Sequence, residues 1–316
     1  MKFRRVGSSG LSVSVLSLGS WLTYGNTTDS ATAAAVIHAA YAAGVNSFDT
    51  ANVYARGEAE KVVGKALAAY PRDSFVLATK AFWPMGDGVN DKGLSRKHVF
   101  EQLHASLRRL GTDYVDIFYC HRFDPQTPLY ETLRTIDDLI RQGKILYAGV
   151  SEWTAAQITE ALGLADKYLL DRIIVNQPAY NLFNRYIEEE VAPVCAKNGL
   201  SQIVFSPLAQ GMLTGKYRQG QPVPAGSRAA DPRTAPFVER YFSEANFNRL
   251  EKLAALAREL GLPLSNLSLA WILSHPNVAS AIVGASRPEQ LEENMKAVDV
   301  RLSEDVLETI ETILEA

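Results

Sequence analysis

The chain has 316 residues, of which 47% are hydrophobic and 21% are charged, and its formal net charge is -3. This composition is typical of a soluble protein, and the length allows two average domains or one large α/β barrel. The slight negative charge argues against binding to nucleic acid or to an anionic membrane, and no apolar run approaches the roughly 20 residues of a membrane span. The two cysteines, Cys120 and Cys195, allow one disulfide but no disulfide scaffold, which suits a reducing cytoplasm. No C-x-x-C or H-x-x-x-H spacing suggests a metal site, so we expect no structural zinc.

In chain order, the first predicted feature is a hairpin, with residues 2–6 and 11–14 on either side of a GSSG turn. Such a hairpin could close the bottom of a barrel. Short apolar runs then alternate with helical patterns along the chain. The apolar runs predict strands at 15–18, 45–48, 75–79, 114–119, 145–150, 173–176, 202–205 and 280–283. The helical patterns predict helices at 30–43, 58–69, 95–110, 128–143, 154–166, 185–198, 288–298 and 304–314.

Alternation of strands and helices predicts a parallel sheet, because parallel strands need crossover connections. The number of strands indicates a closed (β/α)8 TIM barrel, and no G-x-G-x-x-G follows the first strand to suggest a Rossmann domain. We expect one domain, residues 1–316, with the N-terminal β-hairpin and an extra C-terminal helix. Two long loops, at 83–94 and from 211 to about 246, follow the third and seventh strands. Both therefore lie on the face where barrels build active sites.

Ionisable side chains stand at the ends of three consecutive predicted strands. Asp49 and Tyr54 follow the second strand, Lys80 follows the third and His121 follows the fourth. Each alone has an ordinary structural explanation, but together they would converge on one mouth of the barrel. A lysine ammonium close to a phenol oxygen lowers the tyrosine pKa, an aspartate keeps the ammonium charged, and a neutral histidine donates a second hydrogen bond to a carbonyl oxygen. Such a site protonates an alkoxide as it forms, and the hydride must come from a bound cofactor.

The segment GASRPEQLEEN, residues 284–294, follows the last predicted strand. Ser286 and Glu289 have capping-box spacing, so a helix is expected to begin here. Free N–H groups at its start, together with Arg287, would attract a phosphate, although a plain capped surface helix explains the pattern about equally well. A phosphate at Arg287 would favour NADPH over NADH as the cofactor.

The chain resembles the aldo-keto reductases, in particular the branch that includes the potassium-channel β-subunits. The resemblance runs from about Phe3 to Leu314 and rests on motifs such as LGSWLTYG, FDTANVYARGEAEKVVGKAL, NQPAYNLFNR, SPLAQGMLTGKY and GASRPEQLEEN. It implies an NADPH-dependent reductase of aldehydes, and of ketones as a wider possibility. It also implies that the catalytic residues are Asp49, Tyr54, Lys80 and His121, with Tyr54 as the general acid.

The same resemblance implies three groups of cofactor-binding residues and a substrate wall. The nicotinamide end is expected at Ser151, Asn176 and Gln177. The pyrophosphate and a safety-belt loop are expected at Ser206, Pro207, Leu208, Gly211, Lys216 and Arg228. The adenosine end is expected at Gly284, Ser286, Arg287, Gln290, Glu293 and Asn294. The wall that would face a small-molecule carbonyl substrate is expected at Trp21, Tyr24, Phe82 and Trp83.

Two positions bear on alternatives to this interpretation. Glu152 stands where the family commonly has asparagine, which leaves one cofactor contact open. Channel β-subunits carry asparagine at the position of His121, so the histidine favours a working reductase over a cofactor-binding regulatory subunit. A lyase that uses Lys80 as a Schiff-base nucleophile is a third hypothesis. The branch often forms tetramers or octamers, so a homo-oligomer is an open possibility.

Overall fold

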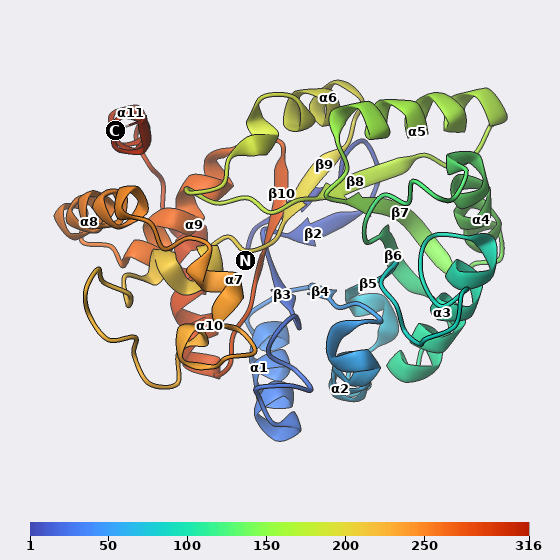
Figure 1. The fold of residues 1–316 in the computed structure, drawn as a ribbon, viewed down its shortest axis with the longest axis horizontal. Helices are drawn as coiled ribbons and strands as arrows, with labels where there is room; N and C mark the ends of the chain where they lie inside the picture. The colour runs from blue at the N-terminus through green and yellow to red at the C-terminus, as the bar shows by residue number, and fades with distance from the viewer. Residues whose placement is uncertain (316) are drawn as a thin grey trace.

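Eight parallel strands close into a barrel in the order β10-β3-β4-β5-β6-β7-β8-β9 (Figure 1). The structure is a computed structural model, and it describes residues 1–315. It confirms the (β/α)8 TIM barrel predicted from the alternating pattern. Most strand residues are buried because the barrel interior lies on one face and helices cover the other, which explains the nearly continuous apolar runs. The strands are β3 (Leu16–Gly19), β4 (Ser47–Asp49), β5 (Val76–Ala81), β6 (Val115–Cys120), β7 (Ile145–Ser151), β8 (Ile173–Gln177), β9 (Ser201–Val204) and β10 (Val278–Val283).

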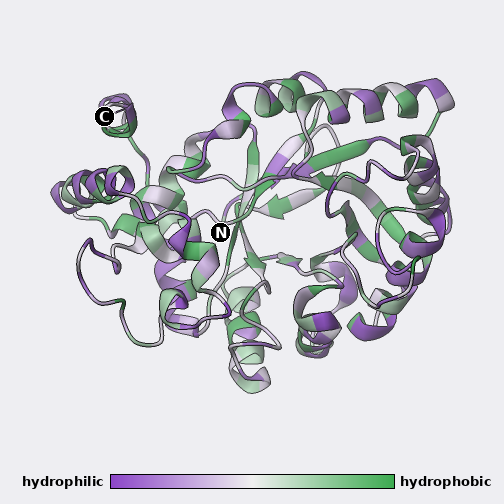
Figure 2. Cartoon of the chain, in the orientation of Figure 1, coloured by the Kyte–Doolittle hydropathy of each residue, from purple (hydrophilic) through white to green (hydrophobic). Residues whose placement is uncertain are grey.

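The helices form the outer layer, with α3 to α6 along one side of the barrel and α7 to α10 along the opposite side (Figure 1). Figure 2 shows strands that are mainly hydrophobic and helices that alternate between hydrophilic and hydrophobic residues along their length. This alternation places an apolar stripe on the sheet and a polar face outward. The predicted helices appear as α1 (Ser30–Ala42), α2 (Glu58–Leu67), α3 (Arg96–Leu110), α4 (Leu129–Arg141), α5 (Ala155–Tyr168), α6 (Val191–Lys197), α10 (Pro288–Met295) and α11 (Glu304–Glu315).

The predicted hairpin consists of β1 (Phe3–Arg5) and β2 (Ser12–Ser14), which pair antiparallel. It closes the bottom of the barrel, because Val6 and Val13 are fully buried against the residues that begin the strands. Its turn contacts the chain just before β9, where the Ser8 N–H donates to the Gly199 carbonyl at 2.8 Å. Gly7 has a φ of +57°, and a Cβ there would lie 2.3 Å from the Gly199 oxygen, so this position requires glycine.

The stretch between β9 and β10 holds three helices that the sequence analysis did not predict. They are α7 (Ala235–Glu239), α8 (Glu244–Glu259) and α9 (Leu264–Ser274). Every residue from 264 to 273 is buried, so α9 has no polar face and lacks the amphipathic period that reveals most helices. The helix predicted at 185–198 was also placed too early, because α6 begins at Val191 after a short 3-10 turn at Tyr186–Glu188.

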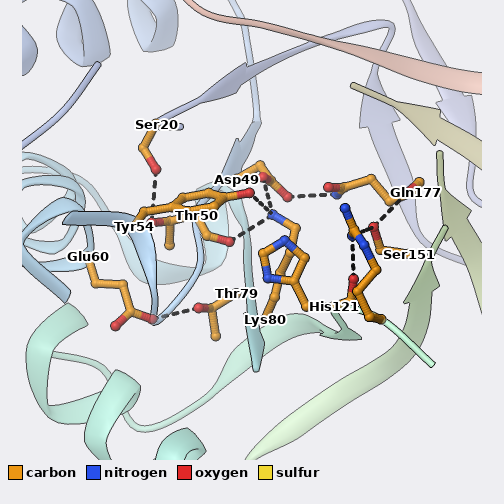
Figure 3. Close-up of polar contacts among 11 residues, drawn as sticks. Ser20, Asp49, Thr50, Tyr54, Glu60, Thr79, Lys80, His121, Ser151 and Gln177 are labelled. Atoms are coloured by element: carbon orange, nitrogen blue, oxygen red, sulfur yellow. Dashed lines mark hydrogen bonds and ion pairs between the residues drawn. The ribbon is translucent and has the colours of Figure 1, made fainter. Parts of the chain in front are cut away.

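A buried ion pair fixes α2 and α3 against the strand that carries Lys80. Glu60 of α2 is fully buried, and its Oε2 lies 2.6 Å from Nε of Arg109 on α3. Its other oxygen accepts a hydrogen bond from the hydroxyl of Thr79 on β5 at 2.6 Å (Figure 3). Both carboxylate oxygens are therefore satisfied, which is the condition under which a charge can be held in a protein interior.

We expect Arg109→Met to lower the free energy of unfolding by about 3–5 kcal/mol, because it leaves the Glu60 carboxylate buried without its cation. Urea unfolding followed by circular dichroism measures the change. Adding Glu60→Leu to Arg109→Met should recover much of the loss, since the uncompensated charge is then gone. The control is Lys97→Met, which breaks the exposed Lys97–Glu101 pair of α3 and should have a much smaller effect. Equal losses in Arg109→Met and Lys97→Met would contradict this explanation.

Candidate active site

The residues predicted to be catalytic meet at the carboxyl ends of the barrel strands. Asp49 is the last residue of β4, Lys80 lies one residue before the end of β5, and His121 directly follows β6. Parallel pairing of these neighbouring strands brings the three side chains to one mouth (Figure 3). A cavity of about 890 Å³ opens there, and Asp49, Tyr54 and His121 line it.

The Lys80 ammonium is the centre of the hydrogen-bond network. Its Nζ donates to Asp49 Oδ1 at 2.5 Å and to the Thr50 carbonyl at 2.9 Å, and it lies 3.3 Å from the hydroxyl oxygen of Tyr54 (Figure 3). The Lys80 side chain has no exposed surface and lies beneath the cavity lining. Burial lowers the pKa of Lys80, and the negative charge of Asp49 acts in the opposite direction. Asp49 therefore compensates the buried charge of Lys80.

Tyr54 is held by a sharp turn between β4 and α2. Ala55 and Arg56 adopt left-handed backbone angles, with φ of 47° and 53°, and Gly57 follows at 94°. Burial, followed by the charge of Asp49, raises the pKa of the Tyr54 hydroxyl well above its usual value. The lowering of this pKa that was expected from Lys80 is not found, because burial and the negative charge of Asp49 both raise the pKa of Tyr54. Tyr54 keeps its proton at neutral pH and is available as a donor.

His121 is a neutral, buried neighbour of the tyrosine. Its ring lies edge-on to that of Tyr54, with the centroids 5.8 Å apart, and 7% of the residue is exposed. Burial, then the charges of Lys80 and Arg122, lower the pKa of His121 well below its usual value. Its Nδ1 is buried and has no hydrogen-bond partner among residues 1–315. The neutral imidazole can donate one N–H, as the sequence-based mechanism requires.

Of the three residues expected at the nicotinamide end, two line the cavity. The Ser151 hydroxyl donates to the Gln177 carbonyl at 2.8 Å, and Gln177 Nε2 donates to Asp49 Oδ2 at 2.8 Å. Asn176 does not belong to this group, because its fully buried side chain donates to Gln202 Oε1 on β9 at 3.0 Å. Asn176 and Gln177 are consecutive in β8, so their side chains point to opposite faces of the sheet.

Glu152 occupies the position that the sequence analysis left open. It has a left-handed φ of 59°, and its carboxylate accepts hydrogen bonds from the Ala179 N–H at 2.5 Å and the Tyr186 hydroxyl at 3.1 Å. The side chain thereby joins the end of β7 to the segment that follows β8. Glu152 is not among the residues that line the cavity.

The other end of the cavity carries a cluster of cations. Desolvation, followed by the charges of Arg228 and Arg287, lowers the pKa of Lys216. Neither Lys216 nor Arg228 forms an ion pair within the described part of the chain, and the Ser227 hydroxyl is buried there without a partner. Gly284 leaves this space open, since a Cβ there would lie 3.5 Å from Arg228 Nη2. Unpaired cations and a free hydroxyl are the donors that a phosphate-bearing cofactor requires.

The remaining residues expected to bind the cofactor also line this cavity, although one detail differs. They are Ser206, Pro207, Leu208, Gly211, Ser286, Gln290, Glu293 and Asn294. The predicted capping box at Ser286 and Glu289 is absent: Arg287 occupies the N-cap position of α10 without a side-chain cap. Instead, the Ser286 N–H and hydroxyl both donate to Gln290 Oε1.

Aromatic rings form the wall beside Tyr54. Trp21, Tyr24 and Trp83 line the cavity as expected, whereas Phe82 does not and packs edge-on against Trp83 with ring centroids 5.1 Å apart. Sequence reasoning missed two further rings on this wall, Phe205 and Phe237, whose centroids lie 6.0 and 5.2 Å from that of Trp21. Phe205 directly follows β9 and could have been found by its place at a strand end. Phe237 comes from α7, in the stretch whose fold was not predicted.

Residues 1–315 contain no group of three or more His, Cys, Asp and Glu side chains arranged to hold a metal ion. No helix within the same residues has the length and apolar character needed to cross a membrane.

The depressed pKa of His121 predicts an acid sensitivity of the fold. As the pH falls through about 6.5, an unfolded chain takes up a proton that the folded protein does not, so the free energy of unfolding decreases on the acid side. We expect His121→Gln to reduce this slope by up to about 1.4 kcal/mol per pH unit. Urea unfolding at about pH 7 and about pH 5 measures the slope. Identical slopes in the two proteins would contradict the prediction, because they would show that His121 takes up its proton equally well in the folded and the unfolded protein.

Comparison with known proteins gives a consistent result over the whole chain. A family model described as "Aldo/keto reductase family" matches residues 15–315. A protein of Arabidopsis thaliana named "Probable voltage-gated potassium channel subunit beta" is 45% identical, with 100% of this chain and 97% of its own length aligned. A protein of the same name from Oryza sativa subsp. japonica has the same identity and coverage.

Proposed function

The chain belongs to the aldo/keto reductase family, and on that premise we propose that it reduces aldehydes, and some ketones, to alcohols with NADPH. Family membership supports an oxidoreductase, and the family generally uses NAD(P)H. The proposal of carbonyl reduction rests mainly on the position of the Tyr54 hydroxyl, which lies 3.3 Å from Lys80 Nζ and beside the neutral His121. We take residues 1–316 as one domain that acts on a small-molecule carbonyl substrate.

In the proposed reaction, Tyr54 is the general acid. The reduced nicotinamide, when bound, supplies the hydride. Tyr54 donates its proton to the carbonyl oxygen as negative charge develops there, and His121 donates a hydrogen bond to the same oxygen. The phenolate left on Tyr54 is then stabilised by the Lys80 ammonium, which Asp49 holds in place at 2.5 Å. The high pKa of Tyr54 before the reaction thus keeps the proton available, and Lys80 stabilises the product of its transfer.

The cofactor is proposed to lie along the cavity, from Gln177 to Arg287. Ser151 and Gln177 would hold the carboxamide, and Phe205 would cover the nicotinamide ring. Lys216 and Arg228 would bind the pyrophosphate, because their charges have no carboxylate partner in the described residues. Arg287 would bind the 2′-phosphate that distinguishes NADPH from NADH, since it lines the same end of the cavity and forms only a loose contact of 3.8 Å with Glu289.

We expect Arg287→Leu to raise the dissociation constant of NADPH by about tenfold and to change that of NADH little, because only NADPH carries the additional phosphate. Fluorescence titration of both nucleotides measures the effect. Arg301→Leu is the matched control, because Arg301 is an exposed arginine outside the cavity. An equal weakening of both nucleotides would assign Arg287 to a part of the cofactor that NADPH and NADH share.

We expect Tyr54→Phe to lower kcat for 4-nitrobenzaldehyde by at least about 100-fold while NADPH still binds, because only the proton donor is removed. NADPH oxidation is followed by absorbance, and NADPH binding by fluorescence, for wild type and variant side by side. Tyr130→Phe, at an exposed tyrosine, is the control and should behave as wild type. A wild-type protein that binds NADPH but reduces nothing in a broad carbonyl panel would overturn the proposal.

A second candidate function rests on the names of the relatives. Those names describe potassium-channel β-subunits. Under this alternative, the chain would be a regulatory subunit that binds the cofactor and docks on a potassium channel with little turnover. The resemblance to channel β-subunits implies asparagine at the position of His121, so the histidine of this chain favours the reductase. We propose a cytoplasmic homo-oligomer, a tetramer or octamer, under either function.

A further inference from the structure

Arg122 lies in the catalytic end of the cavity and has no role in the mechanism above. It directly follows His121, is half-buried and lines the cavity. Its Nη1 donates to the His121 carbonyl at 2.5 Å and reaches the Ser151 hydroxyl at 3.4 Å. The guanidinium carbon lies 5.6 Å from the ring centroid of Trp83. These contacts hold the guanidinium in one place beside the reacting groups.

The guanidinium nevertheless has unused hydrogen-bonding capacity. Both hydrogen bonds involve Nη1, and neither Nε nor Nη2 has an acceptor among residues 1–315. Arg122 forms no ion pair within the same residues. Glu152, the acid that follows Ser151, uses one carboxylate oxygen for Ala179 and Tyr186. The Nε–Nη2 edge therefore remains free, and this edge presents two parallel N–H donors, the geometry that binds a carboxylate through both oxygens.

The other cations in and beside the cavity either have an acidic partner or belong to the proposed cofactor site. Lys80 is neutralised by Asp49 at 2.5 Å. Lys216, Arg228 and Arg287 form the separate cluster that fits the cofactor, where their charges act on one another. Arg122 lies instead close to the catalytic groups, because its positive charge lowers the pKa values of Tyr54, Lys80 and His121. It is thus a cation at the place where the carbonyl substrate would lie, and it forms no ion pair with an acid of residues 1–315.

We propose that Arg122 binds a carboxylate on the substrate, so that the preferred substrates are aldehydes that carry a carboxylate. The inference rests on the proposed reductase function and defines its substrate class. The carbonyl oxygen lies between Tyr54 and His121, and the carboxylate pairs with the free edge of Arg122. Trp83 packs beside the apolar body between the two groups. A half-buried guanidinium binds an anion more strongly than one in bulk water, because the lower local dielectric strengthens the ion pair.

The test compares carboxybenzaldehydes with their methyl esters, which have nearly the same shape and carry no charge. The 2-, 3- and 4-isomers are used, so that the distance between the carbonyl and the carboxylate varies. We expect wild type to prefer the acid in at least one isomer, measured as the ratio of kcat/KM for acid to ester. Arg122→Met should lower this ratio by about 10- to 100-fold. Arg122→Lys, which keeps the charge and loses the fork, should lower it less.

One control variant and one binding measurement separate the possible outcomes. Arg108→Met, at an exposed arginine of α3, should leave the acid-to-ester ratio at the wild-type value. Calorimetric titration with 4-carboxybenzyl alcohol and its methyl ester tests the same preference without turnover. A wild-type ratio near one in every isomer, or a ratio that Arg122→Met leaves unchanged, would overturn the inference while the reductase function stands. Failure to reduce both acids and esters would instead count against the reductase, and weaker NADPH binding in Arg122→Met with an unchanged ratio would assign Arg122 to the cofactor.

Discussion

The ion pair between Lys80 and Asp49 is the interaction on which the rest of the site depends. A lysine with no exposed side-chain surface needs a compensating charge, and the carboxylate 2.5 Å away supplies it. The same carboxylate accepts a hydrogen bond from Gln177 on β8, so one pair links three strands of the barrel. Closure of the barrel brings β8 opposite β4, and the network could not form in an open sheet. The catalytic geometry is therefore a property of the closed fold rather than of any one segment.

Neutralisation of this pair also explains how charge is distributed along the cavity. With Lys80 balanced, Tyr54 lies in a buried environment that keeps it protonated, and the neighbouring imidazole of His121 is uncharged. The catalytic end would carry almost no net charge without Arg122. The opposite end keeps Lys216 and Arg228 unpaired within the described residues, which suits a ligand with several phosphate groups. Among residues 1–315, one end of the cavity thus has cations without carboxylate partners, Lys216 and Arg228, and the other end has Arg122 without an ion pair.

The sequence predicted the barrel and most of the cavity, and the failures have physical causes. The barrel strands were predictable because they are apolar and separated by regular helical patterns, and residues at their ends were predictable because parallel strands converge on one mouth. Asn176 was assigned to the cofactor with Gln177, although side chains alternate across a strand and only one of two neighbours can face the cavity. Helix α9 was missed because it is buried on all sides. Phe237 was missed because α7 reaches the cavity only through tertiary packing, where its ring meets Trp21.

Arg122 was overlooked in the sequence for a related reason. It stands beside His121, and a strand-end pattern assigns the catalytic role to one residue and treats the next as a loop position. In the fold, the chain turns directly after β6, so Arg122 projects along the cavity wall and its Nη1 is held by the carbonyl of the preceding residue. A hydrogen bond to a backbone carbonyl positions the guanidinium but does not neutralise its charge. Positioning by neutral acceptors leaves the charge for a ligand, whereas the carboxylate partner of Lys80 makes that residue a fixed part of the catalytic machinery.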